Sequence, residues 1–576
     1  MSPGADIVLD RRTPAEAISR RDRIVLCLIA VIHVAALIVM ATTETDLVGK
    51  AAFLLAWAAL NFLSLALVRR PAVAALISIE FFVALVLLSR FKYEKLWMTV
   101  DFVDLMIVDP DTSAFLLAAF PSLYGRIALA AAATAALMIV AWRFDRYRVG
   151  VLASLVGGSL SMIALVALSL SFPTNLNEDF IGNNYVSKFA RTGVEAILEF
   201  ADHGFLEADA RAARDLKAAP DLKRAPAAAC HASRNLPHII LLHDESSFDI
   251  ATAPGIKVPP GYANHFQSFD GKARKLLVEG VGGPSWFSEY NVLTGLSVRS
   301  YGRFATSVTR IAAGRVSRGL PHSLSRCGYK TFSLYPFYGA FLGSRAFQMT
   351  TGIAYYLDMR DLGTSDFEAD RFYFDQAVKI IEHERGDGPL FLYVYTVANH
   401  FPWDTRLRPE LTPDWRDLGN APDVEEYIRR QGMMAHDYSK LLQQLAQNFP
   451  AESFLIVRYG DHQPQFGARI LDPSLSTEAL SRRLAARDPR YLTTYYAIDA
   501  VNFTPADLSS ALDTLDAPYL PLVIQEAAGV PLDLGFSEQK KILQRCDGLF
   551  YGCGSGVEVR RFNRLLIDAG SVKGLD

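Results

Sequence analysis

Five apolar runs in the first third of the chain constrain its fold more than any other feature. They cover about residues 24–42, 51–68, 72–89, 127–142 and 150–171. Each run is close to the roughly 20 residues that cross a bilayer as a helix. A soluble protein with this many long apolar runs would be unusual, so we expect an N-terminal bundle of about five transmembrane helices. This bundle explains a mean hydropathy of +0.16 in a chain of which 21% is charged.

Arginine clusters beside these runs predict the orientation of the bundle. They lie before the first run, after the second run, and between the fourth and fifth runs: Arg11, Arg12, Arg20, Arg21 and Arg23; Arg69 and Arg70; Arg143, Arg146 and Arg148. The positive-inside rule places all three clusters in the cytoplasm. An odd number of crossings then puts everything after about residue 172 outside it. The first run lacks a small-residue cleavage site, so we interpret it as an anchor. We predict a multi-pass protein of the bacterial cytoplasmic (inner) membrane, with a periplasmic or extracellular catalytic domain.

Changes in composition predict four segments. Residues 1–171 form the transmembrane domain, residues 172–234 a connector, residues 235–545 a catalytic domain, and residues 546–576 a C-terminal tail. Within the first segment, residues near 90–125 are mixed in polarity. They form either an interfacial segment at the lipid headgroups or a segment that packs between the bundle and the catalytic domain.

The segment after residue 235 alternates strand and helix patterns. Short apolar runs predict strands at Ile239–Leu242, Lys275–Val278, Thr331–Leu334, Leu390–Val394 and Phe454–Val457, and amphipathic patterns predict helices at 371–384 and 423–447. Such alternation is typical of an α/β domain with a mostly parallel sheet covered by helices. About 310 residues are enough for a sizeable core.

Acidic residues and a histidine follow two of these strands. Asp461 and His462 come directly after the strand at Phe454–Val457, and Glu245 and Ser246 follow the strand that begins at His238. Open α/β folds place ligand sites at the carboxyl edge of the sheet. Carboxylates with an imidazole suit a divalent cation, with zinc or manganese as the first candidates and magnesium as a third. His243 alternates onto the face of Glu245, either as support for this site or as a hydrogen-bonded core residue.

The glycine-rich segment GVGGPSWFSEYNVLTG, residues 280–295, supplies a third element. Its turn ends at Ser285, and a helix-like run follows. A hydroxyl at the amino end of a helix lies where backbone N–H groups and the helix dipole favour a phosphate oxygen. A bound divalent cation would lower the pKa of the Ser285 hydroxyl and make it a nucleophile. Taken alone, the same segment is also typical of an ordinary turn.

Together these motifs resemble the lipoteichoic acid synthase and phosphoglycerol transferase family of the alkaline phosphatase/sulfatase superfamily. The resemblance covers about residues 236–535, and the five-span anchor fits it as well. The strand that ends in Glu245-Ser246, the turn GGPSWFSEYNVLTG, the segment Leu320–Thr331, NHFPW around His400, and YGDH at Asp461-His462 carry it.

The resemblance implies the roles of individual residues. It implies a cation held by Glu245, Ser285, Asp461 and His462, with Ser285 as the nucleophile. His400 would hold a phosphate oxygen or protonate the leaving group, or else be a structural residue at a strand end. Arg345 is the only basic residue in the segment that carries the glycerol phosphate contacts in the family. Trp403 would contact a sugar or acyl chain, or pack in the core.

The implied reaction is the transfer of a headgroup from a phospholipid to a glycan or lipid acceptor. The donor would be phosphatidylglycerol or phosphatidylethanolamine, and a phospho-Ser285 intermediate would carry its phosphoglycerol or phosphoethanolamine group. Two alternatives remain: a phosphodiesterase or phosphatase of the same fold, and an inactive membrane scaffold. The sulfatase signature, Cys or Ser followed by x-Pro-x-Arg, is absent around Ser285, which disfavours sulfate ester hydrolysis.

Charge and cysteine content add two expectations. The net charge is −3 and no basic tract is present, so the sequence does not suggest a nucleic acid partner. Cys546 and Cys553 are seven residues apart. In an oxidising compartment they form either a local disulfide or two free thiols.

Overall fold

The structure is a computed structural model that describes residues 20–96, 98–107, 116–117, 120–174, 182–209 and 236–575. It divides into two compact units, which we describe separately. Unit 1 comprises the chain up to Phe102, Pro121–Thr174 and Glu178–Glu195. Unit 2 comprises Val103–Phe120, a few residues near 175, and everything from Ala196 onward.

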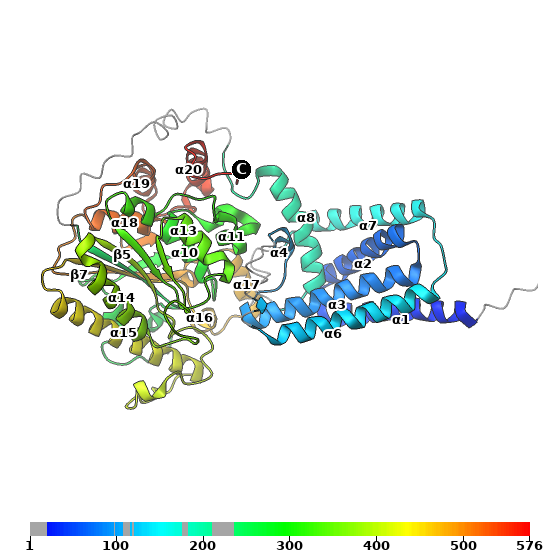
Figure 1. Ribbon diagram of the computed structural model, residues 1–576, viewed down its shortest axis with the longest axis horizontal. Coiled ribbons are helices and arrows are strands. Elements are labelled where there is room, and N and C mark those ends of the chain that lie inside the picture. Colours follow the sequence, from blue (N-terminus) through cyan, green and yellow to red (C-terminus); the bar gives the residue numbers. More distant parts are fainter. Residues whose placement is uncertain are drawn as a thin grey trace, which may run out of the picture. The chain divides into compact units, whose positions relative to one another are not determined.

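Unit 1 contains, among the described residues, five helices long and apolar enough to cross a membrane. They are α1 (Arg20–Thr43), α2 (Leu47–Val68), α3 (Pro71–Leu96), α6 (Ser122–Phe144) and α7 (Val151–Ser171) (Figure 1). The expected five spans are therefore confirmed. The third helix continues to Leu96 and the fourth starts at Ser122, so both extend into the segment predicted as a loop near 90–125. Most of the centre of that loop, residues 108–115 and 118–119, lies outside the described residues.

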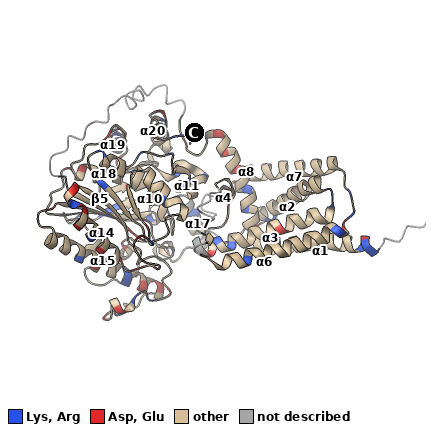
Figure 2. Ribbon diagram, viewed as in Figure 1, with Lys and Arg blue, Asp and Glu red and all other residues tan. Residues whose placement is uncertain are grey.

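The arginine clusters of the described residues meet at one end of unit 1. Arg21 Nε donates to the Phe144 carbonyl oxygen at 3.0 Å, and Arg70 Nη1 donates to the Asp145 carbonyl oxygen at 3.0 Å. The Arg70 guanidinium also lies 3.9 Å from the centre of the Trp142 ring. Figure 2 shows few charged residues along the middle of these helices. The contacts thus place Arg21 and Arg70 at the same end of the apolar span.

Unit 2 is built on an eight-stranded sheet in the order β4-β3-β5-β1-β6-β7-β2-β8. The strands are β1 (His238–Asp244), β2 (Arg274–Leu277), β3 (Lys330–Leu334), β4 (Tyr355–Leu357), β5 (Leu390–Tyr395), β6 (Phe454–Gly460), β7 (Thr493–Val501) and β8 (Thr514–Asp516). All neighbours are parallel except β7, which is antiparallel to β6 and to β2. The expected mostly parallel α/β sheet is confirmed, with β4, β7 and β8 in addition to the predicted strands.

Helices α14 (Asp370–Glu384) and α15 (Pro422–Asn448) cover one face of this sheet (Figure 1). Their apolar residues, such as Phe374 and Leu441, pack on Ile240 and Leu242 of β1 in one buried cluster. Both helices match the predicted amphipathic segments. Each helix is stabilised because its apolar face is buried on the sheet.

The remaining helices of unit 2 precede, connect or follow the strands. They are α4 (Phe102–Met106), which begins one residue ahead of the unit, α10 (Ser285–Thr294), α11 (Val308–Ala312), α12 (Leu320–Ser325), α13 (Ser344–Thr350), α16 (Gly467–Leu471), α17 (Thr477–Ala485), α18 (Leu520–Ala527), α19 (Leu534–Cys546) and α20 (Val557–Asp568). Helix α8 (Tyr185–His203) belongs partly to each unit. It lies in the segment predicted as a connector, of which residues 210–234 are outside the described range.

The segment predicted as a C-terminal tail contains the folded helix α20. Phe562 and Leu565 of this helix are buried, and the backbone N–H of Phe205 donates to the Leu575 carbonyl oxygen at 2.8 Å. Cys546 and Cys553 are joined by a disulfide, which decides between the two expectations for this pair. The end of the chain is therefore an integral part of unit 2.

Candidate active site

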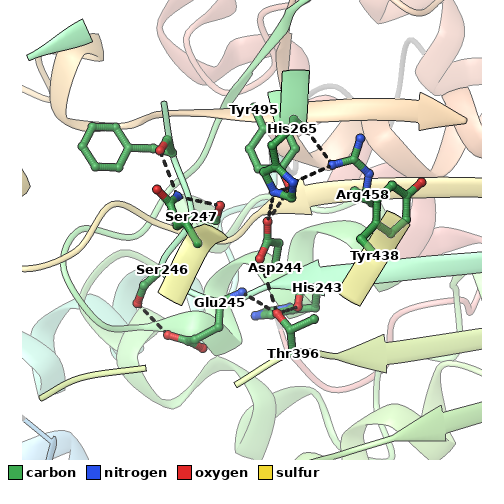
Figure 3. A network of polar contacts seen from close by, with 12 residues as sticks. His243, Asp244, Glu245, Ser246, Ser247, His265, Thr396, Tyr438, Arg458 and Tyr495 are labelled. Atoms are coloured by element: carbon green, nitrogen blue, oxygen red, sulfur yellow. Dashed lines mark hydrogen bonds and ion pairs between the residues drawn. The ribbon is translucent and has the colours of Figure 1, made fainter. Parts of the chain in front are cut away.

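The carboxyl ends of three adjacent parallel strands place the candidate residues together. In the sheet register His243 of β1 lies opposite Tyr395 of β5, and Asp244 lies opposite Gly460 of β6. Glu245, Thr396 and Asp461 each follow one of these strands, so they emerge at the same edge. The backbone N–H of Glu245 donates to Thr396 Oγ1 at 3.1 Å (Figure 3). The predicted location at the carboxyl edge of the sheet agrees with this arrangement.

Ser285 is the first residue of α10, directly after the glycine-rich turn. Gly282 has a φ of +69°, a conformation that favours glycine, and Pro284 has a non-helical ψ of 72°, so the helix begins at Ser285. The helix ends at Gly295, whose φ is +71° and whose N–H donates to the Asn291 carbonyl oxygen. Every residue of α10 after Ser285 is buried, whereas Ser285 itself is half-exposed. Ser285 is thus held at the first position of a buried helix and is itself only partly covered.

The Ser285 hydroxyl meets the strand-end residues directly. Its Oγ lies 3.2 Å from Glu245 Oε2 and 3.2 Å from His462 Nε2. His462 Nε2 is in turn 3.2 Å from Asp461 Oδ2 and 3.7 Å from Glu245 Oε1. The structure therefore brings together the four residues that the sequence nominated as metal ligands.

These four residues fit a divalent cation by their chemistry. Two carboxylates, an imidazole nitrogen and a hydroxyl give four donor atoms, the number found in zinc sites, and the mixed set suits zinc or manganese. Glu245, Asp461 and His462 are all buried. The donor atoms of His243, Glu245 and Asp461 also lie within 4.8 Å of one another. A buried pair of carboxylates needs a compensating positive charge, and a cation here would supply it.

Hydrogen bonds orient the carboxylate of Asp461. Its Oδ1 accepts the backbone N–H of Ser246 at 2.7 Å and that of His462 at 2.8 Å. Burial alone would raise the pKa of Asp461, but the His462 imidazole and the hydrogen bond from His243 outweigh it and hold the pKa below its usual range. Asp461 is therefore ionised, as a metal ligand must be.

His400 lies on the loop that follows β5. Its Nδ1 is 2.7 Å from the Phe401 carbonyl oxygen, which places the ring proton on Nδ1 and leaves the lone pair on Nε2. The ring is half-exposed and stacks on Phe401 at 4.4 Å between centroids. Arg430 Nη1 donates to the His400 carbonyl oxygen at 2.7 Å and so fixes the backbone. This arrangement is suited to proton transfer, and the role of His400 stays a prediction.

Arg345 and Trp403 have partners within the protein. Arg345 Nη2 lies 2.9 Å from a carboxylate oxygen of both Asp358 and Asp361. Trp403 is buried, and its ring packs on Phe466 with 5.0 Å between centroids. Neither side chain is brought to Ser285 by a contact in the described residues. Their roles in substrate binding therefore stay predictions that these contacts do not strengthen.

Sequence reasoning missed two supporting residues. Thr396 contacts Glu245 as described above, and Ser288, one turn after Ser285, donates its hydroxyl to the Asp461 carbonyl oxygen at 2.5 Å. Neither residue has a motif of its own. Only its position in the sequence could have indicated Thr396, which lies two residues after the predicted strand at Leu390–Val394.

A second buried polar network lies beside the site. Asp244 Oδ2 accepts a hydrogen bond from His265 Nε2 at 2.9 Å and another from the Tyr495 hydroxyl, and Arg458 Nη1 donates to the His265 carbonyl oxygen at 2.6 Å (Figure 3). Burial lowers the pKa of His265. Asp244 thus faces away from the Ser285 cluster and belongs to the core.

Comparison with known families finds a match within unit 2. Residues 284–492 match the family described as Sulfatase, a segment that contains Ser285, His400, Asp461 and His462. This part of unit 2 is therefore similar to the sulfatase family, and the expected sulfatase-like fold is confirmed. Among curated proteins, no sequence matches this chain.

Several solved structures are similar to this chain at low identity. Phosphoglycerol transferase GacH from Streptococcus pyogenes is 14% identical over 64% of this chain and 94% of its own, with a TM-score of 0.46. Lipooligosaccharide phosphoethanolamine transferase A (EptA) from Neisseria meningitidis is 12% identical over 86% of this chain and 98% of its own, with a TM-score of 0.47. Lipoteichoic acid synthase LtaP from Listeria monocytogenes is 14% identical over 55% and 78%, with a TM-score of 0.38.

Proposed function

We propose that this protein is a membrane-anchored, metal-dependent transferase that moves a phosphoglycerol or phosphoethanolamine headgroup from a phospholipid to a glycan or lipid acceptor. The observation that carries the proposal is the position of Ser285, a half-buried residue at the amino end of α10 whose Oγ lies 3.2 Å from both Glu245 Oε2 and His462 Nε2. A role in the turn alone would not explain why three buried residues of metal-binding types, Glu245, Asp461 and His462, surround this serine.

Glu245, Ser285, Asp461 and His462 would hold one divalent cation, zinc or manganese, with magnesium as a third candidate. When bound, such a cation lowers the pKa of a coordinated hydroxyl and neutralises charge on a phosphoryl group. The backbone N–H groups at the start of α10 favour a negatively charged phosphate oxygen beside Ser285. The site therefore combines a nucleophile with groups that stabilise negative charge.

The reaction has two steps. In the first, Ser285 Oγ forms a bond to the headgroup phosphorus, and the bond from phosphorus to the diacylglycerol oxygen breaks. The Ser285 hydroxyl loses its proton in this step and the leaving oxygen takes one. His400 Nε2, which carries a lone pair, is the candidate to accept the first proton and pass it to the leaving oxygen. In the second step an acceptor hydroxyl attacks the phospho-Ser285 group and gives up its proton, and Ser285 is released. Such a sequence predicts ping-pong kinetics.

The apolar helices support a membrane substrate and an orientation. The arginines at one end of unit 1, through the contacts of Arg21 and Arg70, fit the cytoplasmic side of the membrane. With five crossings, the residues of unit 2 after the last helix then lie outside the cytoplasm, in the periplasm or cell exterior. A headgroup transferase needs access to lipid, which a membrane anchor provides.

A hydrolase of the same fold is the second candidate. A phosphodiesterase or phosphatase would use the same residues and pass the phospho-Ser285 group to water. The third candidate, an inactive scaffold, is not supported by a complete set of ligands around Ser285. The identity of the donor headgroup does not distinguish a transferase from a hydrolase. The group that removes the headgroup from Ser285, an acceptor hydroxyl or water, distinguishes them.

The experiment is mass spectrometry of the full-length protein after incubation with membranes of defined phospholipid. Wild type should carry an added mass on the peptide with Ser285, equal to phosphoglycerol or phosphoethanolamine. Ser285→Ala should fold, keep most of its metal and carry no added mass, whereas Ser285→Thr should keep measurable loading. Ser288→Ala, the matched control on the same helix, should still be loaded. Loading of Ser285→Ala but not of Ser288→Ala would refute the assignment of the nucleophile.

A further inference from the structure

We propose that His243 is a positioning residue that holds the Asp461 carboxylate in its ligand orientation; the inference rests on the proposed metal centre. Among the described residues, His243 is fully buried at the end of β1. The sequence left its role open between support of the site and ordinary packing in the core. The contacts on both nitrogens of its ring favour support.

The first argument is that the two carboxylate oxygens of Asp461 have different partners. Its Oδ1 already accepts two backbone N–H groups, from Ser246 and His462. Its Oδ2 lies 3.1 Å from His243 Nε2 and 3.2 Å from His462 Nε2. Oδ2 is therefore the atom that would bind a cation beside His462. A hydrogen bond from His243 Nε2 fixes the remaining freedom of that oxygen.

The second argument is that the other ring nitrogen is committed. His243 Nδ1 lies 2.7 Å from the Tyr459 hydroxyl and 3.1 Å from the Tyr393 hydroxyl, and the two hydroxyls are 2.7 Å apart. A tyrosine hydroxyl can donate to Nδ1, which leaves the ring proton on Nε2, facing Asp461. The Tyr395 ring stacks on the imidazole at 4.1 Å between centroids. Position, tilt and proton are thus all determined by neighbours.

The third argument separates His243 from the ligands themselves. Glu245, Ser285, Asp461 and His462 already give four donors, and His462 Nε2 is the imidazole nitrogen that lies 3.2 Å from the nucleophile. A nitrogen that carries its proton toward Asp461 has no lone pair for a cation. Residues that hold ligands in place commonly change metal affinity by about 10- to 100-fold when they are replaced.

The test measures zinc affinity of the full-length chain in detergent by competition with a chelator. His243→Leu removes the donor, and His243→Gln keeps an N–H group at about the same reach. His238→Leu is the matched control: His238 is a buried histidine at the opposite end of the same strand, where its Nδ1 accepts the Leu390 N–H at 3.0 Å. X-ray absorption of the bound zinc counts the imidazole ligands directly.

We expect His243→Leu to weaken zinc binding by about 10- to 100-fold, His243→Gln to restore most of it, and His238→Leu to bind as wild type does. Absorption should give one imidazole per zinc in wild type and in His243→Gln. If His243→Leu fails to fold, Tyr459→Phe, which removes one donor to Nδ1, should show a smaller loss.

Three results would overturn the role. Equal zinc affinity of wild type and His243→Leu would make His243 a core residue, without affecting the proposed function. Two imidazoles per zinc in wild type would make it a direct ligand. A wild-type chain that binds no zinc, manganese or magnesium would overturn the metal centre of the proposed function and the role of His243 with it.

Discussion

Asp370 should make the stability of this protein depend on pH near neutrality. Its carboxyl is fully buried at the start of α14, where Oδ1 accepts the backbone N–H groups of Val397 and Ala398 at 2.8 and 3.0 Å. Oδ2 is buried without a hydrogen-bond partner among the described residues. Burial outweighs the two hydrogen bonds and raises the pKa of Asp370 from 3.8 to about 7.

The direction of the effect follows from the raised pKa. The folded state keeps a proton on Asp370 that the unfolded state has lost, so the contribution to stability is full below about pH 4 and is lost as pH rises to 7. Each pKa unit corresponds to about 1.4 kcal/mol. Between about pH 5.5 and about pH 8.5 the carboxyl titrates over roughly 1.5 units, so this group should cost about 2 kcal/mol of unfolding free energy.

Asp370→Asn keeps the shape of the side chain, including an oxygen that accepts both N–H groups, and does not titrate. The variant should therefore lose about 2 kcal/mol less than wild type between those two pH values. The assay is thermal or denaturant unfolding of the full-length chain in detergent, followed by tryptophan fluorescence. Because Asp370 holds the backbone that leads to His400, activity at high pH should also persist better in the variant.

A matched control is Asp270→Asn. Arg274 donates to Asp270 and holds its pKa below the usual range, so Asp270 stays ionised throughout this pH window. Asp270→Asn should show the same pH slope as wild type. Parallel slopes for wild type and Asp370→Asn would refute the reasoning, since they would mean that Asp370 does not titrate between those pH values.

Two further predictions concern the metal and the membrane. Metal analysis of the purified protein should find one tightly bound divalent cation, and Asp461→Ala or His462→Ala should lose it; full occupancy in both variants would remove these residues from the site. A reporter fused after Asp576 should be active only if it works when exported, and a reporter fused near Arg146 only if it works in the cytoplasm; the reverse pattern would place unit 2 inside the cell.

The sequence predicted the elements that have strong local patterns. The five apolar helices and the strands such as β1 and β6 appear as apolar runs, and α14 and α15 appear as amphipathic periods. By contrast, β4 and β8 have three residues each, which is too short for a pattern. The β7 segment TTYYAIDAV has few consecutive aliphatic residues. It also pairs antiparallel with β6, so the alternation of strands and helices that is typical of a parallel sheet does not predict it.

Some residues of the candidate site could likewise be predicted from the sequence, and others could not. Glu245, Ser285, Asp461 and His462 could be nominated because each follows a recognisable strand or turn. Thr396 and Asp370 could not, because their hydrogen bonds go to backbone N–H groups, which every residue except proline has. The structure pairs Arg345 with Asp358 and Asp361, which its place in the sequence did not indicate, and its role in substrate binding stays a prediction.

The contacts of the four residues from His243 to Ser246 leave no room for an insertion or a deletion in this part of the chain. Four consecutive residues make four different contacts: the side chains of His243, Asp244 and Glu245 contact Asp461, His265 and Ser285 in turn, and the backbone N–H of Ser246 donates to Asp461. A shift of one residue in a strand turns every following side chain to the opposite face. Insertions and deletions should therefore be absent from 238–246 and should accumulate instead in the mostly exposed segment 251–261.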